Sequence, residues 1–445
     1  MDHECVARES AATGAALLPA GVILRCTKAV ESRGLAPVRA MPAGTLAAVP
    51  SSSHPILDGV RERFAASTDF TVGMEEEYQL LDPATMGLVQ RFEDLMETAP
   101  DDLRPRLAGE LISSEIEFRT GPHATFAGAA RELAEGRRAL IEHAGSHGVA
   151  TAISGCHPFS PWQEQHIIET PHYERVEGEL GYIAWINNTW AQHLHVGLRD
   201  ADRAVRVCTA MRSVLPEILA LSANSAIYLG RLTRLHSTRT SLFTRSFPRC
   251  GIPDPLMDFD EYADFVRLLE RTGSIVESTQ IWWSIRPHHA FGTIEVRIAD
   301  AQTEMGEALA ILALSLALIA RFADDHDAGL PLPAHPGRLI EENLWRAQRH
   351  GLDGRMIDFA RGEERSTADA VRALMEFTAP VHDRLGLGPF LARIPVMLEE
   401  GNGAQRQARA FASGEDLVAL HAQAAERTRR SAEEALELMG METNV

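Results

Sequence analysis

Hydrophobic and polar residues alternate along several short segments of the chain, which is the pattern of half-buried β-strands. In residues 70–81 (FTVGMEEEYQLL), Met74 and Leu80 fall on one side of an extended strand, whereas Glu75 and Glu77 fall on the other. The same alternation predicts further strands at 110–119, 149–154, 192–198, 280–286 and 293–299. Because their apolar sides must face one core, we expect their polar sides to meet on the opposite face of the same sheet.

Longer segments repeat their apolar residues at the spacing of amphipathic helices. They predict helices at 125–146, 201–224, 258–271 and 303–323, and an almost entirely helical region from about residue 335 onward. Asp200 and Asp258 precede two of these helices and are suitable N-caps. The order of elements predicts an α/β (α+β) fold, in which a mostly antiparallel sheet has one helix-covered face and one active-site face, followed by a helical C-terminal portion.

The predicted elements divide the chain into three regions. Residues 1–66 are rich in Ala, Pro, Ser and Gly and show no sustained period, so we expect a disordered N-terminal extension. Residues 67–330 form the predicted catalytic α/β core, and residues 331–445 the helical C-terminal portion packed on the same unit.

Composition narrows the classes of partner. The formal net charge of −19 argues against nucleic acid or an anionic membrane as the main partner. Lys28 is the only lysine, so no Walker-type phosphate loop can be present, and arginines and metal ions would have to hold a nucleotide triphosphate. Five scattered cysteines, no clear signal peptide and no apolar run of about 20 residues predict a cytoplasmic protein without a membrane span.

The polar sides of four predicted strands carry charged or imidazole groups. Besides Glu75 and Glu77 these are Glu115, Glu117, Arg119, His193, His195, Glu295 and Arg297. Such a face would repel itself without cations, and a carboxylate-rich site suits Mg²⁺ or Mn²⁺ better than zinc. A solvated sheet face shows the same alternation, and His-x-His can belong to a core. The four strands together, with Arg286 and Arg297 available for anions, favour a metal and phosphate site.

Other segments are less specific. Arg239, in a Ser/Thr-rich loop (STRTSLFT, 237–244), could bind a substrate or form a surface salt bridge. His157, in the turn GCHPF, could contact a ligand or cap its own loop. Glu76 falls on the apolar side of its strand, which indicates a structural ion-pair partner. Cys156 has no clear base beside it, so a nucleophilic role is not expected.

The motifs FTVGMEEEYQLLDP, ELISSEIEFRTGP, GCHPF, QHLHVGL, STR and IRPHHAFGTIEVRIAD follow one another along residues 70–330. In this order they resemble the glutamate–cysteine ligase type 2 family of ATP-dependent carboxylate–amine ligases. The Glu-x-Glu, His-x-His and Glu-x-Arg strands are also similar to the metal and phosphate elements of glutamine synthetases. The resemblance therefore implies a glutamine-synthetase-like catalytic fold.

The resemblance implies a role for each matching residue. Mg²⁺ (or Mn²⁺) would be bound by Glu75, Glu77, Glu117 and Glu295, with His195, and also His193, near the metal or the ATP phosphates. Arg297 would contact the transferred phosphate, Arg239 the substrate carboxylate, and Arg286 would be a second anion clamp. The implied partners are ATP, glutamate and cysteine or another amine, and a homodimer is implied as well.

The implied reaction joins the γ-carboxylate of glutamate to the amine of cysteine through an acyl phosphate, giving γ-glutamylcysteine, ADP and phosphate. One of the carboxylates or His157 would take the proton of the amine. Four alternatives stay open at this point: a ligase with another acid or amine, a phosphotransferase related to guanidino kinases, an ATP-independent metal hydrolase, and a binding protein without activity.

Overall fold

The computed structural model describes residues 55–442, which belong to one compact unit. The part of the predicted extension before residue 55 lies outside the described residues. The last part of the predicted extension is a helix, α1 (Val60–Ala66), which buries Val60 and Phe64 against the main core. Disorder was therefore the wrong prediction for this segment, because two apolar residues one helical turn apart suffice to dock it. The boundary predicted at residue 330 stays a prediction.

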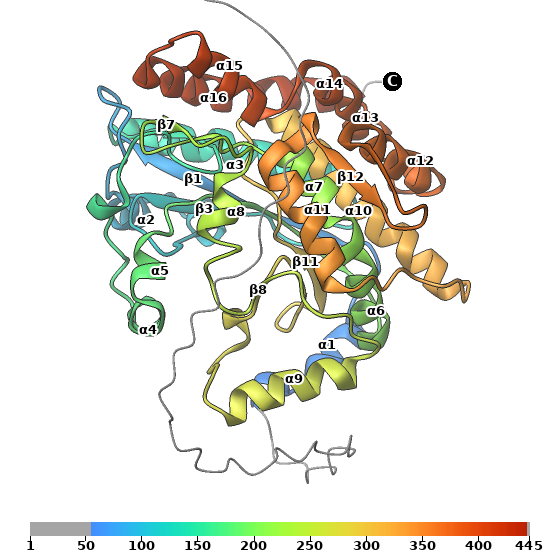
Figure 1. The fold of residues 1–445 in the computed structure, drawn as a ribbon. Coiled ribbons are helices and arrows are strands. Elements are labelled where there is room, and N and C mark those ends of the chain that lie inside the picture. Colours follow the sequence, from blue (N-terminus) through green and yellow to red (C-terminus); the bar gives the residue numbers. More distant parts are fainter. Residues whose placement is uncertain (1–54, 443–445) are drawn as a thin grey trace, which may run out of the picture. The chain divides into compact units, whose positions relative to one another are not determined.

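A seven-stranded sheet forms the centre of the described chain (Figure 1). Its strands lie in the order β10 (Ile285–His288), β11 (Thr293–Val296), β5 (Gln192–Gly197), β1 (Val72–Leu81), β3 (Glu115–Arg119) and β2 (Leu107–Ala108), and β4 (Ala150–Ala152) also pairs with β1. Every pairing in this sheet is antiparallel, which confirms the predicted sheet type.

The strand register brings the predicted site residues together on one face. Glu75 lies opposite His193 on β5 and Arg119 on β3, while Glu77 lies opposite Glu117. One strand further, His195 lies opposite Glu295. Residues directly opposite in an antiparallel pair point to the same side of the sheet, so the polar sides of four strands form one surface.

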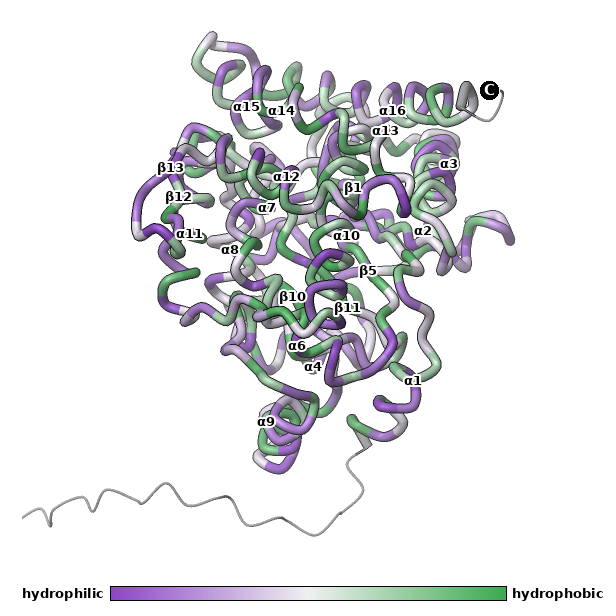
Figure 2. Tube along the Cα trace, turned by 90° about the vertical axis from the view of Figure 1, so that its right-hand side faces the viewer, coloured by the Kyte–Doolittle hydropathy of each residue, from purple (hydrophilic) through white to green (hydrophobic). Residues whose placement is uncertain are grey.

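Helices cover the other face of the sheet. They are α3 (Phe126–Ser146) on β1 and β3, α6 (Ala201–Met211) on β10 and β11, and α10 (Met305–Asp327) on β5. By length and composition α10 could cross a membrane, but its apolar side chains are almost all buried inside the protein. Figure 2 shows this apolar helix in the middle of the described chain. Asp200 and Asp258 cap α6 and α9 (Phe259–Arg271), as predicted, by accepting hydrogen bonds from backbone N–H groups of the first turn.

Three predicted elements differ from those observed. The helix expected at 201–224 is interrupted by a 3₁₀ turn (Arg212–Val214) before α7 (Leu215–Ser222), because Pro216 has no N–H to donate to the preceding turn. The strand expected at 280–286 is two pieces, β9 (Trp282–Trp283) and β10. The strand expected at 110–119 begins only at Glu115, after a turn in which Glu115 N–H donates to the Ile112 carbonyl (3.1 Å).

The C-terminal portion is helical, as predicted, apart from one hairpin. Its helices are α11 (Gly337–His350), α12 (Thr367–Leu385), α13 (Gly388–Leu391), α14 (Arg393–Glu400), α15 (Gly403–Ala412) and α16 (Leu417–Glu442). The hairpin of β12 (Arg355–Asp358) and β13 (Glu363–Ser366) was not predicted, because its strands are short and mostly polar. Figures 1 and 2 show α14, α15 and α16 along one end of the described chain, where α16 packs on α3 and β4.

The remaining elements are short or lie at the periphery. They are the helices α2 (Phe92–Thr98), α4 (Pro171–Leu180), α5 (Tyr182–Trp185) and α8 (Thr238–Leu242), the strand pairs β6 (Ile227–Tyr228) with β7 (Arg231–Leu232) and β8 (Cys250–Gly251) with β9, and 3₁₀ turns at Pro55–Leu57, Arg104–Arg106, Trp162–Glu164, Ser278–Gln280 and Gly351–Asp353.

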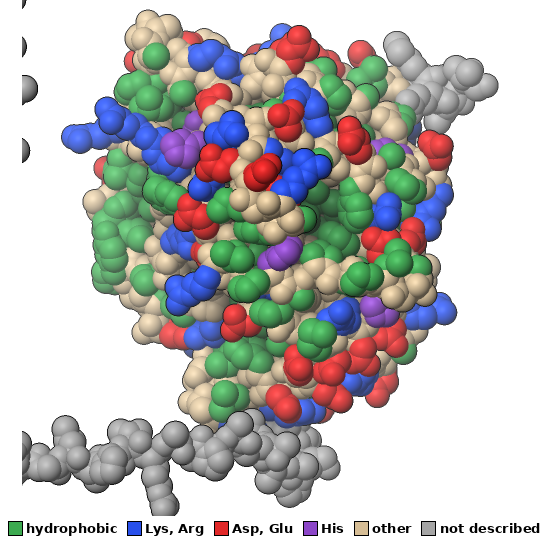
Figure 3. Space-filling model, turned by 45° about the vertical axis from the view of Figure 1, so that its right-hand side comes forward, with side chains coloured by type: hydrophobic (Ala, Val, Ile, Leu, Met, Phe, Trp, Pro, Cys, Tyr) green, Lys and Arg blue, Asp and Glu red, His purple; other side chains and the backbone are tan. Residues whose placement is uncertain are grey.

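Charged side chains of both signs are interspersed over the face drawn in Figure 3, and acidic ones gather toward its lower right. Many surface arginines are paired, for example Arg61 with Asp202 (2.9 Å) and Arg203 with Asp327 (2.6 Å). An arginine with an unpaired buried N–H is therefore informative in this protein.

Candidate active site

Two histidines of β5 hold Glu75 of β1 in place. His193 Nδ1 lies 3.0 Å from Glu75 Oε2, and His195 Nε2 lies 3.2 Å from Glu75 Oε1. Burial alone would raise the pKa of Glu75, but the charge of His195 and hydrogen bonds from both imidazoles hold that pKa well below its usual range. In return, Glu75 and Glu295 raise the pKa of His195 against the effect of burial. Glu75 is therefore an anion in a nearly closed setting.

Two arginines hold Glu295 of β11 in the same way. Arg286 donates from Nε to Glu295 Oε2 (2.6 Å) and from Nη2 to Oε1 (3.3 Å), and Arg297 donates from Nη1 to Oε1. Against burial, the positive charges of Arg286 and Arg297 keep the pKa of Glu295 well below its usual range. The remaining Nη1 of Arg286 donates to the carbonyls of Thr279 and Ile281, so this side chain braces Glu295 instead of waiting for a second anion.

Arg297 keeps a donor free. Among the described residues, its buried Nε–H has no hydrogen-bond partner. A guanidinium that is fixed at one nitrogen and unpaired at another is suited to bind an incoming phosphate or carboxylate oxygen.

The other half of the polar face is a cluster of carboxylates. Burial and the negative charges of neighbouring carboxylates raise the pKa values of Glu115 and Glu117 well above their usual range, and burial with the charge of Glu77 raises the pKa of Glu110 to about 8. Arg119 lies 3.5 Å from Glu117 but is half exposed, so it neutralises little of this charge. The cluster lacks cationic charge.

Two groups of ligand atoms on this face could hold metal ions. Glu75, His193 and Glu295 form one, and Glu77, Glu117 and His193 form the other, with the ligand atoms of each group within 4.8 Å of one another. His193 Nε2 is buried without a hydrogen-bond partner and lies 3.8 Å from Glu77 Oε1. Unsatisfied imidazole nitrogen and mutually repelling carboxylates are what a divalent cation would relieve, so the residues fit such an ion.

A cleft of about 500 Å³ opens onto this face. Glu75, Glu117, His195, Arg286, Glu295 and Arg297 line it, whereas Glu77 and His193 are not among its lining residues. Aromatic side chains, including Tyr173, Trp282 and Phe291, form the rest of its wall. The volume lies within the usual range of small-molecule sites.

The structure gives Arg239 and His157 partners other than a substrate. Arg239 is buried outside the cleft, where it donates to the carbonyls of Ile298 and Arg297 (3.1 Å each), so it does not face a substrate carboxylate. His157 donates from Nε2 to the Met86 carbonyl (2.9 Å) and accepts the Ser160 N–H at Nδ1 (2.9 Å). It caps its own loop and, away from the cleft, cannot take a proton from the amine.

Sequence reasoning missed two cleft residues, Glu110 and His288. Glu110 falls on the apolar side if 110–119 is one strand, but the turn before Glu115 resets the alternation and directs Glu110 into the cleft. His288 follows Arg286 at the spacing of a strand, so continued alternation along β10 would have found it. Its ring lies 5.0 Å from that of His195 and stacks on Phe291.

Comparison with known proteins identifies the family of the chain. The model of glutamate–cysteine ligase family 2 matches residues 71–434. The chain belongs to this family. Among its relatives, a candidate glutamate–cysteine ligase 2-2 of Rubrobacter xylanophilus is 36% identical over 337 residues, or 76% of this chain and 86% of the relative. One of Sorangium cellulosum is 37% identical over 353 residues, or 79% and 94%.

Two solved structures share the fold of this glutamate–cysteine ligase family 2 member at low sequence identity. A glutamate–cysteine ligase of Francisella tularensis in complex with AMP has a TM-score of 0.57 and 10% identity, over 84% of this chain and 93% of the other. A bifunctional glutathione synthetase of Pasteurella multocida has a TM-score of 0.56 and 14% identity, over 84% and 53%. The expected ligase fold is thereby confirmed.

Proposed function

We propose that this chain is an ATP-dependent carboxylate–amine ligase that joins the γ-carboxylate of glutamate to the amine of cysteine. The observation that carries the proposal is that the unpaired Arg297 Nε–H and two sets of metal-ligand atoms lie on one face of the sheet, onto which the cleft opens. Family membership supports the ligase class, and the AMP bound to the Francisella tularensis protein supports a nucleotide substrate.

Mg²⁺, when bound by Glu75, His193 and Glu295 and by Glu77, Glu117 and His193, would neutralise the phosphate oxygens of ATP. The side chains of the chain then have mainly to orient the reactants. Arg286 keeps Glu295 ionised and fixed, and the two histidines do the same for Glu75. Arg297 donates to the phosphoryl group during its transfer and stabilises the charge that develops on it.

The reaction needs no covalent enzyme intermediate. An oxygen of the γ-carboxylate attacks the γ-phosphorus of ATP, and ADP leaves. The amine nitrogen then attacks the acyl carbon, phosphate leaves, and one of the carboxylates of the cleft takes the proton that the nitrogen loses. Cys156, as expected, is no candidate for a nucleophile, since burial and the charge of Asp300 raise its thiol pKa well above the usual range.

The reaction is expected in the cytoplasm, where ATP is available. The described cysteines (Cys156, Cys208 and Cys250) are free thiols, which suits a reducing compartment.

The test is phosphate release from Mg·ATP by the purified full-length protein, with amino acids supplied singly and in pairs. We expect release only with glutamate plus an amine, with γ-glutamylcysteine identified by mass spectrometry. Release with glutamate and a different amine would keep the ligase and correct the substrate. Formation of ADP and a stable phosphorylated product with a single acceptor, without phosphate release, would indicate a phosphotransferase. No release with any pair would contradict the proposal.

A further inference from the structure

A second cavity, of about 400 Å³, lies in the helical layer. Residues of α7, α10, α11, α12 and the β12–β13 hairpin form its wall, and it shares no lining residue with the cleft. Phe322, Phe359 and Phe377 contribute apolar surface to it, and Ser213, Glu217 and Arg365 contribute polar groups. A mostly apolar pocket with a few convergent polar groups is the usual form of a small-molecule site.

Three side chains of this cavity each have a buried polar atom without a partner. Glu217 Oε2, Ser213 Oγ and Arg365 Nε are buried and make no hydrogen bond within the described chain. Glu217 is only 4% exposed. A buried polar atom without a partner costs about 1–3 kcal/mol, and buried groups of this kind are rare in folded proteins. Three on one cavity wall indicate a missing polar ligand.

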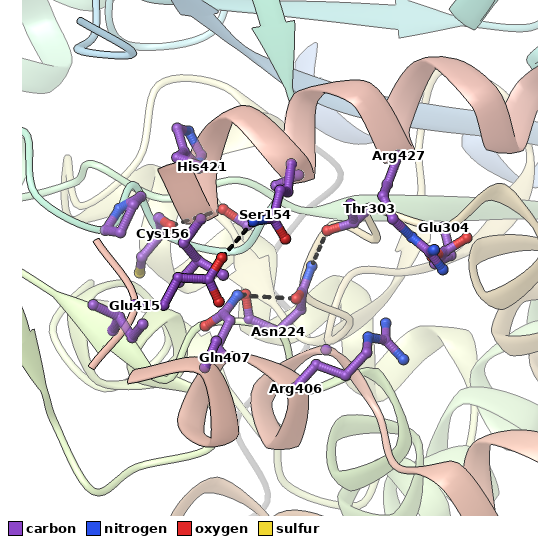
Figure 4. A pocket seen from close by; sticks show the side chains of 17 residues that line it. Ser154, Cys156, Asn224, Thr303, Glu304, Arg406, Gln407, Glu415, His421 and Arg427 are labelled. Atoms are coloured by element: carbon purple, nitrogen blue, oxygen red, sulfur yellow. Dashed lines mark hydrogen bonds and ion pairs between the residues drawn. The ribbon is translucent and has the colours of Figure 1, made fainter. Parts of the chain in front are cut away.

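In another cavity of similar size, the buried polar groups do have hydrogen-bond partners. It measures about 330 Å³ and lies between α15, α16 and the turn after β4 (Figure 4). There Asn224 bonds Gln407 (3.0 Å) and Thr303 (3.3 Å), and Glu304 pairs with Arg427. Apart from His421 Nε2, no buried side-chain polar atom of its lining residues lacks a hydrogen-bond partner within the described chain. Size alone therefore does not leave polar groups unpaired.

The charges around Glu217 define what it can accept. Burial raises the pKa of Glu217 to about 7, a hydrogen bond from its own backbone N–H and the Arg365 charge oppose this, and the Asp358 charge adds to it. The other charged groups on the wall are Asp325, which is bonded to Arg321 (3.0 Å), and His335, whose pKa is lowered by burial and by Arg212. Glu217 is thus a carboxyl group left without a cation, and a cationic donor would ionise it.

Arg365 offers the complementary group. One of its terminal nitrogens lies 3.9 Å from Asp358 Oδ2, and its Nε–H is left for an anionic acceptor. We propose that this cavity binds a free α-amino acid with an apolar side chain. Its ammonium group would donate to Glu217 and Ser213, its carboxylate would accept from Arg365, and its side chain would lie against the three phenylalanines.

The inference does not depend on the proposed reaction, and its test measures binding. Isothermal titration calorimetry of the full-length protein with L-phenylalanine and L-leucine should detect one bound molecule. Phenethylamine, which lacks the carboxylate, and 3-phenylpropanoate, which lacks the ammonium group, should each bind at least about tenfold more weakly than L-phenylalanine. Near pH 7, titrations in buffers of different ionisation enthalpy should report proton release as Glu217 ionises.

Variants separate this cavity from the cleft. Glu217→Gln and Arg365→Gln should each weaken binding about tenfold or more, and Glu217→Gln should abolish the proton release. Arg361→Gln is the matched control, since Arg361 lies in the same hairpin but is exposed and outside the cavity. Binding should also survive Arg297→Ala, which alters the cleft. No binding of either amino acid, loss of binding in Arg297→Ala, or unchanged binding in both Glu217→Gln and Arg365→Gln would overturn the proposal.

Discussion

Strand β1 carries neighbouring glutamates on the two sides of the sheet, and the hydrogen-bond partners available to them differ between these sides. Glu76 points into the helix-covered side, where Arg137 of α3 donates to both carboxylate oxygens and Tyr78 donates to one of them (2.5 Å). Arg137 also donates to the carbonyls of Thr303 (3.0 Å) and Gln302 (3.1 Å). Both charges are completely buried and satisfied inside the protein, as the position of Glu76 on the apolar side of its strand predicted.

Glu75 and Glu77 point to the other side of the sheet, onto which the cleft opens and which we call the open side. Several buried polar atoms on this side have no hydrogen-bond partner. His193 Nε2, Arg297 Nε and Glu115 Oε1 are buried there without hydrogen-bond partners in the described chain. The same residue type on one strand therefore has two functions. A buried carboxylate whose partners are all internal stabilises the fold, and a buried carboxylate among unpaired groups indicates a ligand.

The largest difference between the two sides should appear in turnover. Arg297→Ala should lower kcat about 10³-fold or more, because it removes the donor to the moving phosphoryl group. Its thermal unfolding should change little, since Arg297 braces Glu295 only from one side and Arg286 remains. Phosphate release and a thermal melt measure the two effects. Arg267→Ala, on the surface of α9, is the control, and an Arg297→Ala enzyme within tenfold of wild type would refute the contrast.

Substitutions on the helix-covered side should instead change the free energy of unfolding. Arg137→Met leaves the Glu76 carboxylate buried without its partner and should lower the free energy of unfolding by about 3–5 kcal/mol. Glu76→Leu combined with Arg137→Met should recover most of this loss, because no buried charge remains. Urea unfolding measures both variants. On the open side, Glu117→Gln removes one of several repelling charges and should not destabilise the protein. A loss as large as that of Arg137→Met would erase the distinction.

A third, smaller effect should be a loss of folding stability when the pH is lowered. Burial lowers the pKa of His157 from 6.5 to about 4. Between these values the unfolded chain binds a proton that the folded protein does not, so stability present above about pH 6.5 falls as the pH is lowered to 4, by up to about 3 kcal/mol. His421, whose ring lies edge-to-face against that of His157, has a pKa lowered in the same direction by burial and by His157.

Replacing His157 by Asn should remove its share of this pH dependence. Urea midpoints measured at several pH values between about 7 and 4.5 should fall less steeply for His157→Asn than for wild type. Parallel curves would show that His157 is not the group that titrates.

The smallest effect is expected from a substitution of Arg239, which does not face the open side but bonds the backbone carbonyl of Arg297. Arg239→Lys keeps the charge but replaces the two terminal nitrogens that bond the carbonyls of Ile298 and Arg297 by a single one without the planar fork geometry. We expect kcat/KM to fall about tenfold through misplacement of Arg297, with the KM for glutamate nearly unchanged. A rise in that KM with unchanged kcat would instead support the direct substrate contact that the resemblance implied.

Much of the candidate site could be read from alternation along single strands. Glu75, Glu77, His193, His195 and Glu295 follow from the two-residue period, because a strand must put successive side chains on opposite faces. Glu110 could not be found in this way, since a turn changes the face on which it lies. Arg239 could not be assigned either, because a loop sequence does not reveal whether its guanidinium meets solvent, substrate or backbone.

The sequence by itself determined the sheet, its apolar and polar faces and the family, because these depend on local periodicity and on ordered motifs. Only the tertiary structure decided which charges have partners. Arg137 reaches Glu76 across 61 positions of the chain, and Ser213, Glu217 and Arg365 meet at one cavity from separate elements. Hydrogen-bond satisfaction depends on groups brought together by long-range packing, and residue spacing along the chain contains no measure of it.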